Sequence, residues 1–205
     1  MQILCIGDSN TWGYNPENGL QHKNRWTKVL GDLLPEHEII EEGMCGRTVL
    51  TVDSYEPAWC GIHALPGIIQ AHNRADIVIL MLGTNELKAE FKHNAMYIAE
   101  GIGEFIKMLQ NPDFWMYKKV PRLLVVSPIL LGDDILEKDG ICTQFDEMSL
   151  RESKQMAGAI ENICKQYHVE FMDGAKYARA SLTDAIHMDE ENHIKLAYAI
   201  YGKIT

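Results

Sequence analysis

The chain opens with Gln2-Ile3-Leu4-Cys5-Ile6-Gly7-Asp8-Ser9-Asn10-Thr11, a short apolar run that ends in a glycine and a polar turn. The apolar part shows no clean alternation of polar and apolar residues, which is typical of a strand covered on both faces in a parallel sheet. In parallel α/β folds, ligands bind beyond the carboxyl ends of the strands. This stretch therefore predicts the fold class and also one edge of a site.

The same pattern recurs along the chain. Further short apolar runs occur at His37–Ile40, Ile77–Leu82, Leu123–Val126 and, more weakly, Val169–Met172. Stretches with apolar residues at helical spacing lie between or after them, at Arg25–Leu34, Ala95–Leu109, Met148–Tyr167 and Asn192–Ile204. Strands that alternate with helices of this length imply right-handed crossovers. We therefore predict an α/β fold of the flavodoxin-like kind, a three-layer α/β/α sandwich around a mostly five-stranded parallel sheet.

Length and composition indicate one globular domain. The 205 residues suffice for a single α/β domain with a full core and are too few for two domains that each have one. Apolar residues make up 46% and charged residues 23%, which are ordinary globular values. The sequence contains no repeat and no Pro/Gly/Ser-rich linker. We expect residues 1–205 to form a single domain.

Charge and cysteine content exclude several classes of protein. The net charge of -10 disfavours binding to a phosphate backbone, so we expect no nucleic-acid partner. The longest apolar run, Ile77–Leu82, is far too short to span a membrane, and no signal-peptide pattern precedes the first strand. Five widely spaced cysteines without a C-x-x-C pair favour reduced thiols over disulfides or a zinc site. We expect a cytoplasmic protein, unless a leader has been removed.

The polar turn after the first strand is the first candidate site. On its own, Gly7-Asp8-Ser9 is a common turn and helix-cap sequence. Its position after a strand would instead project the Ser9 hydroxyl into the crevice, near the start of a helix. Helix N-termini favour negative charge that develops during a reaction. The position makes Ser9 a candidate nucleophile.

Two more turns follow strands. Gly83-Thr84-Asn85-Glu86 follows the third strand, where Thr84 or Asn85 would cap a helix or the Asn85 amide would donate to an oxyanion. The segment 42–48 follows the second strand, and a glycine there either supplies a turn with positive φ or lets its N–H approach a substrate closely. Each of these signals is weak when isolated.

An Asp-x-x-His pair, Asp184 and His187, precedes the last helical stretch. Such a pair is common by chance and usually forms a surface hydrogen bond, but it also suits a carboxylate that orients an imidazole base. We interpret the other histidines as structural or exposed. The acidic clusters Asp133-Asp134 and Asp189-Glu190-Glu191 favour a solvated loop and a helix start over metal ligands.

Taken together, the order and spacing of these motifs resemble the four sequence blocks of SGNH (GDSL-like) hydrolases. The chain is most similar to the bacterial arylesterase/acyltransferase branch, and the resemblance spans nearly its whole length. The stretches that carry it are Ile3–Tyr14, Arg25–Leu30, Ile39–Gly43, Met81–Asn85, Val125–Pro128 and Asp184–His187.

The resemblance implies a role for each matching position. Ser9 would be the nucleophile, His187 the general base and Asp184 its orienting carboxylate. The backbone N–H groups of Ser9 and Gly46 and the side chain of Asn85 would form the oxyanion hole. Trp12 stands where the branch has a tryptophan in the acyl pocket, although a packing aromatic fits equally well. Two residues depart from the family pattern and bear on substrate fit: Asn10 replaces the commoner leucine, and Glu86 the commoner aspartate.

The resemblance implies a serine esterase that acts on small acetyl or aryl esters through an acyl-enzyme, with water or another alcohol as the acceptor. It needs no metal or organic cofactor, and it allows a homo-oligomer. Carbohydrate deacetylation is the alternative within the class. Apolar residues of the segment Ile129–Glu147, from Ile129 to Leu136, would either wall the acyl site or only pack the loop.

Two alternatives come from other classes. Phosphoryl transfer by Asp8 would require a second carboxylate two residues later, but the chain has Asn10 at that position, which disfavours this alternative. A ligand-binding domain that has lost activity would not need Ser9, Asp184 and His187.

Overall fold

The computed structural model describes residues 1–54 and 56–205. Within these residues, five parallel strands form one sheet in the order β2-β1-β3-β4-β5. The strands are β1 (Gln2–Gly7), β2 (Glu38–Gly43), β3 (Ile77–Met81), β4 (Arg122–Ser127) and β5 (Glu170–Asp173). Each lies within a residue or two of a predicted apolar run, or extends it by up to three residues. The predicted α/β fold is confirmed.

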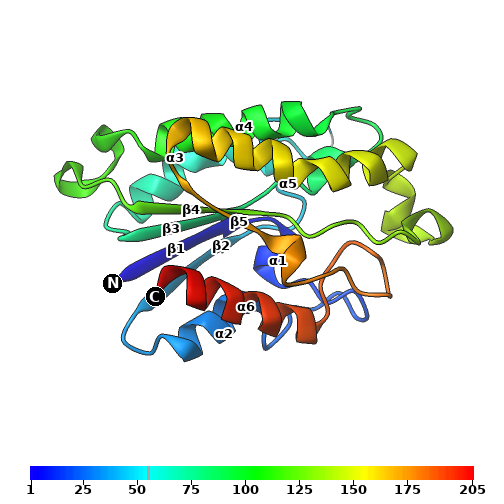
Figure 1. Ribbon diagram of the computed structural model, residues 1–205, viewed down its shortest axis with the longest axis horizontal. Helices are drawn as coiled ribbons and strands as arrows, with labels where there is room; N and C mark the ends of the chain where they lie inside the picture. The colour runs from blue at the N-terminus through cyan, green and yellow to red at the C-terminus, as the bar shows by residue number, and fades with distance from the viewer. Residues whose placement is uncertain (55) are drawn as a thin grey trace.

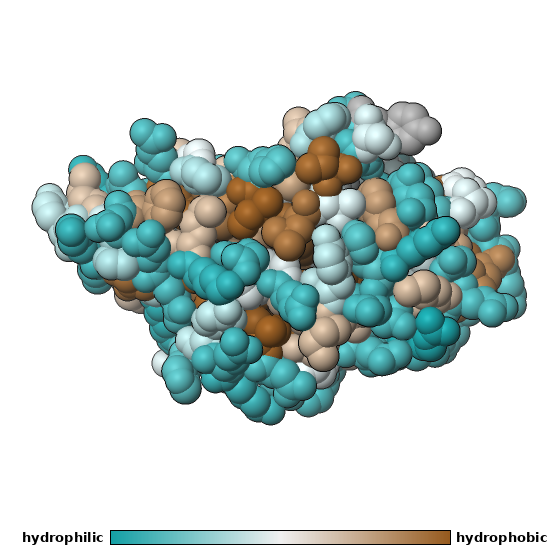
Figure 2. Space-filling view, turned by 90° about the horizontal axis from the view of Figure 1, so that it is seen from above, coloured by the Kyte–Doolittle hydropathy of each residue, from teal (hydrophilic) through white to brown (hydrophobic). Residues whose placement is uncertain are grey.

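Helices cover both faces of the sheet, which makes the three layers visible in Figure 1. One face carries α3 (Gly61–Ala71), α4 (Ala95–Leu109) and α5 (Glu147–Tyr167). The other carries α2 (Trp26–Leu33) and α6 (Glu190–Ile204). Seen from outside, the α3–α5 face has hydrophilic side chains over most of its periphery and hydrophobic ones near its middle (Figure 2).

Alternate residues of each central strand serve opposite layers. Leu4 and Ile6 of β1 belong to the core under α3, α4 and α5, whereas Ile3 and Cys5 belong to the core under α2 and α6. All four side chains are fully buried. An apolar side chain is therefore needed at every position, which explains the unbroken apolar runs in the sequence.

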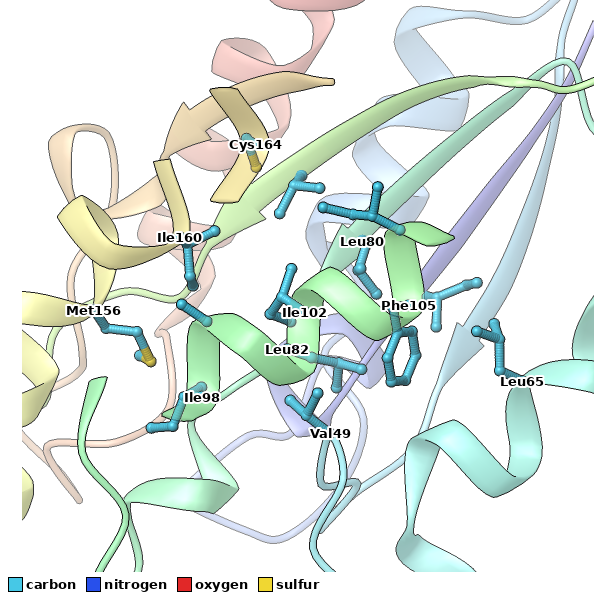
Figure 3. Packing of buried hydrophobic residues seen from close by; sticks show 14 of the residues in the cluster. Val49, Leu65, Leu80, Leu82, Ile98, Ile102, Phe105, Met156, Ile160 and Cys164 are labelled. Atoms are coloured by element: carbon cyan, nitrogen blue, oxygen red, sulfur yellow. The ribbon is translucent and has the colours of Figure 1, made fainter. Parts of the chain in front are cut away.

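The larger core lies between α4 and the sheet. Ile98, Ile102 and Phe105 of α4 lie over Leu80 of β3 (Figure 3). Met156, Ile160 and Cys164 of α5, Leu65 of α3, Val49 and Leu82 complete the part of the cluster labelled there. This packing holds the carboxyl ends of β1 and β3 in a fixed position, and the turns that follow them inherit it.

Among the longer helices of the described residues, α3 is one that the sequence did not predict. Its eleven residues include Gly61, Pro66 and Gly67, all poor helix formers. The buried side chains of Leu65, Ile68 and Ile69 tie it to the larger core instead. Tertiary packing has overridden local propensity here.

Candidate active site

Ser9 lies at the start of a one-turn helix, α1 (Ser9–Trp12), directly beyond β1. The carboxylate of Asp8 caps this helix by accepting the N–H of Asn10 at 2.9 Å. The helix lies very close to the sheet. A Cβ on Gly43, at the end of β2, would be only 2.3 Å from the backbone nitrogen of Trp12. Glycine at that position lets the turn with Ser9 sit on the strand ends.

The side chains of Ser9, His187 and Asp184 form one continuous hydrogen-bonded chain. The Nε2 atom of His187 lies 2.8 Å from the Oγ of Ser9, and its Nδ1 lies 2.5 Å from the Oδ2 of Asp184. All three residues are less than a tenth exposed. A hydroxyl, an imidazole and a carboxylate linked in this order can activate the hydroxyl for acyl transfer.

Asp184 is held firmly within its turn. Its Oδ1 accepts the backbone N–H groups of Ile186 at 3.0 Å and His187 at 2.9 Å. Burial alone would raise the pKa of Asp184, but the hydrogen bond and charge of His187 and these N–H groups outweigh burial and hold the pKa below its ordinary value. The group is therefore a stable anion beside the imidazole.

The predicted oxyanion donors lie at the same pocket. Gly46 and Asn85 line it together with Ser9. Gly46 has a φ of +79°, in the left-handed region that favours glycine. The Asn85 amide donates one hydrogen to the carbonyl oxygen of Arg47 at 3.0 Å, which leaves its second hydrogen for another acceptor.

Two buried carboxyl groups lie beneath these turns. Burial raises the pKa of Asp8 to about 6, against the hydrogen bond from Asn10 and the charges of His187 and Arg47. Burial also raises the pKa of Glu86 to about 7, although one of its oxygens accepts the backbone N–H of Val49. Glu86 thus ties the turn after β3 to the chain that follows Gly46.

The pocket over Ser9 has a volume of about 200 Å³. Its mainly apolar wall comes from Tyr14, Trp59, Ile141, Phe145 and Ile186. The ring of Tyr14 lies 4.5 Å from that of His187, centroid to centroid. Among the described residues that line the pocket, Tyr14 occupies the place proposed for Trp12, whose ring lies 6.5 Å from that of Tyr14.

The segment 129–147 does reach the pocket, but through other residues than expected. Ile129, Leu131 and Ile135 are buried in the core, and Leu130 and Leu136 are partly exposed away from the pocket wall. Ile141 and Phe145 form the wall instead. For Ile129, Leu131 and Ile135, packing of the loop is the possibility that the structure shows.

The sequence motifs did not single out Tyr14, Trp59 or Phe145. Tyr14 closes the first motif block, so its position in that block was the available signal. Trp59 ends one short 3-10 helix (Pro57–Trp59) and Phe145 follows another (Gly140–Gln144), and both helices are too short to show a periodic pattern. In the described part of the chain, no group of three or more His, Cys, Asp or Glu side chains is arranged to hold a metal ion.

The sequence model of GDSL-like lipases and acylhydrolases matches residues 5–195. The chain belongs to this family. Members of this family are hydrolases. The geometry of the site described above is compatible with hydrolysis by this GDSL-like hydrolase. Residues 1–54 and 56–205 contain no helix with the length and apolar character needed to cross a bilayer.

Solved structures resemble this GDSL-like hydrolase over nearly its full length. A carbohydrate acetylesterase from Sinorhizobium meliloti is 30% identical with a TM-score of 0.90, and the match covers 99% of this chain and 97% of that one. The aryl esterase of M. smegmatis is also 30% identical, with a TM-score of 0.89 and the same coverage. A lipolytic G-D-S-L protein from Veillonella parvula, 14% identical with a TM-score of 0.68 and coverage of 100% and 98%, shares the fold. No curated protein matches by sequence.

Proposed function

We propose that the protein is a serine esterase that cleaves short-chain acyl esters through a Ser9 acyl-enzyme. The observation that carries this proposal is the hydrogen-bonded chain from Ser9 through His187 to Asp184 at the floor of the pocket. A serine hydroxyl is nearly inert at neutral pH unless a base lies within hydrogen-bond reach. His187 is placed to be that base.

The proposed reaction has two halves. The Oγ of Ser9 attacks the ester carbonyl carbon while its proton passes to Nε2 of His187, and the carbonyl oxygen becomes an oxyanion. The N–H groups of Ser9 and Gly46 and the Asn85 amide stabilise that oxyanion. His187 then returns its proton to the leaving alcohol oxygen as the C–O bond breaks. Water or a second alcohol repeats the sequence on the acyl-enzyme and regenerates Ser9.

The pocket supports short acyl groups. Its volume of about 200 Å³ is below the range of roughly 300–1,000 Å³ that drug-sized ligands occupy. Apolar side chains such as Ile141 and Phe145 suit the hydrocarbon part of an acetyl or small aryl ester. We therefore expect kcat/KM to fall steeply as the acyl chain is lengthened.

The test uses p-nitrophenyl acetate and an organophosphonate. The wild-type protein should hydrolyse the first, and mass spectrometry should find a single adduct of the second on Ser9. Ser9→Ala should lose both the burst of p-nitrophenol and the adduct. The rate should also decline on the acid side, because a protonated imidazole cannot accept the Ser9 proton. Turnover by Ser9→Ala equal to that of wild type would refute the proposal.

A second candidate, deacetylation of carbohydrates, rests on a neighbouring hollow. It has a volume of about 480 Å³ and shares Trp59, Lys88 and Gln144 with the smaller pocket. Asp53, Glu90 and Thr143 add polar groups to its lining. An aromatic ring beside hydrogen-bonding side chains suits a hydroxyl-rich alcohol, and the resemblance to a carbohydrate acetylesterase agrees with it.

The two candidates differ in what the larger hollow contributes. If it holds a sugar, Thr143→Ala should lower kcat/KM for an acetylated xyloside and leave p-nitrophenyl acetate turnover nearly unchanged, because Thr143 lines the larger hollow and not the pocket over Ser9. Equal effects on both esters would favour the simple arylesterase.

A further inference from the structure

The side chain of Asn10 holds the backbone on both sides of His187. Its Oδ1 accepts the N–H of Met188 at 3.0 Å, and its Nδ2 donates to the carbonyl oxygen of Ile186 at 3.3 Å. Asn10 is 2% exposed, so water does not compete for these bonds. Asn10, which directly follows Ser9, is thus hydrogen-bonded to both sequence neighbours of His187.

Asn10 is itself fixed. Its backbone N–H donates to the Asp8 carboxylate at 2.9 Å, within the same turn as Ser9. Several other anchors of His187 are local to its own turn: Asp184 holds two N–H groups, and the Ser181 N–H donates to the His187 carbonyl at 2.7 Å. Those bonds shape the turn, whereas the Asn10 bonds place it relative to α1.

The turn has a strained backbone. Ala185, between Asp184 and His187, has a φ of +58°, which costs an L-residue roughly 1–2 kcal/mol. A strained segment keeps its conformation only when the surrounding structure over-determines it. Two hydrogen bonds from a buried amide supply part of that constraint.

We propose that Asn10 is a positioning residue for acyl transfer, which sets the Nε2 of His187 against the Oγ of Ser9. This inference rests on the proposed function. A leucine at this position has no polar atoms and could not form either bond. The distance of 2.8 Å between base and nucleophile therefore depends on the amide of Asn10.

The main test is Asn10→Leu. It removes both bonds, and a misplacement of the base by about 1 Å can cost on the order of 100-fold in rate. We expect kcat for p-nitrophenyl acetate to fall by about that factor while KM stays within about threefold, because Asn10 does not line the pocket. A kcat within about threefold of wild type would overturn the proposal.

The matched control is Asn192→Leu. Asn192 is also buried, and its amide also forms two bonds, from the Arg179 N–H and to Asp189, but neither involves a neighbour of His187. We expect thermal stability to fall in both variants and kcat per folded molecule to fall only in Asn10→Leu. An equal loss of kcat in Asn192→Leu would show a general effect of removing a buried amide and would overturn the proposal.

Asn10→Asp keeps the size of the side chain and adds a signature that a purely structural role would not produce. An ionised carboxylate can still accept the Met188 N–H but repels the Ile186 carbonyl, whereas a protonated carboxyl can donate to it. The ratio of variant to wild-type kcat should therefore rise as the pH falls. A ratio that does not change with pH would contradict the proposal, even if Asn10→Leu fails to fold. If the organophosphonate forms no adduct on Ser9 of the wild-type protein, the proposed function itself is refuted.

Discussion

The ring of Trp59 lies directly against Gly46. A Cβ on Gly46 would lie 2.8 Å from the Cε3 atom of that ring, closer than real Cβ contacts allow. Trp59 also lines the pocket over Ser9, so the same side chain forms the wall of the site and fixes the backbone of a proposed oxyanion donor.

Gly46→Ala should consequently lower kcat by at least about tenfold, since both the steric clash and the positive φ displace the N–H from the oxyanion. Steady-state kinetics with p-nitrophenyl acetate measure this. Gly67→Ala, in helix α3 with open space around the new methyl group, is the control and should keep wild-type turnover. A Gly46→Ala protein with normal kcat would exclude this N–H from the reaction.

Asn85→Ala should lower kcat by roughly 100- to 1,000-fold, the loss of about 3–4 kcal/mol expected when one oxyanion donor is removed. KM should change much less, because the lost contact forms mainly in the transition state. Stopped-flow measurement of the burst rate separates acylation from later steps. Unchanged turnover would remove Asn85 from the site.

Glu86 should make the stability of the fold depend on pH. Its pKa is raised by burial from 4.5 to about 7, so between these values the folded protein retains a proton that the unfolded chain has released. The resulting stability is complete below pH 4.5 and is lost as the pH rises through about 7.

Glu86→Gln should abolish this part of the pH dependence, because the amide does not ionise and can still accept the Val49 N–H. Urea denaturation at pH values from 4.5 to 8 would show the free energy of unfolding of the variant rising relative to wild type across the window. Glu90→Gln, at an exposed carboxylate on the same segment, is the control. Parallel curves for wild type and Glu86→Gln would be inconsistent with a protonated Glu86.

Phe105→Ala should destabilise the protein by about 3–5 kcal/mol, the usual cost of removing a phenyl ring from a packed core. Phe105 of α4 is fully buried in the cluster between this helix and the sheet (Figure 3). Met96→Ala, at an exposed position of the same helix, should change stability by less than about 1 kcal/mol. Similar urea midpoints for the two variants would mean that α4 does not anchor the core.

The sequence predicted the strands of the sheet well because burial on both faces requires uninterrupted apolar runs. It also placed Ser9, Gly46 and Asn85 in turns after strands, and Asp184 and His187 ahead of the last helix. In the structure Ser9, Gly46, Asn85 and His187 line one pocket, and Asp184 is hydrogen-bonded to His187. Their catalytic roles remain predictions until the variants are measured. The helices were predictable because burial of one helix face requires apolar residues at helical spacing.

Contacts without a local pattern were beyond reach. The hydrogen bond between Asn10 and Met188 joins residues 178 positions apart, and no local sequence pattern around either residue indicates it. The direction of Trp12 and Tyr14 depends on the left-handed turn at Gly13 between them. Ile141 lies in a short 3-10 helix and Phe145 directly follows it, and five residues are too few for hydropathy to indicate which side faces the pocket.

The placement of the proposed base just ahead of α6 has a consequence for how activity is acquired. Leu196, Ala197 and Ile200 of α6 are buried in the core on the α2 side, so docking of this last helix draws the turn with His187 toward α1. A folding intermediate with an intact sheet but an undocked α6 would present Ser9 to solvent without its partner. Ester turnover would thus serve as a built-in reporter of completed folding, and it should return with the slowest spectroscopic phase when the denatured chain is allowed to refold.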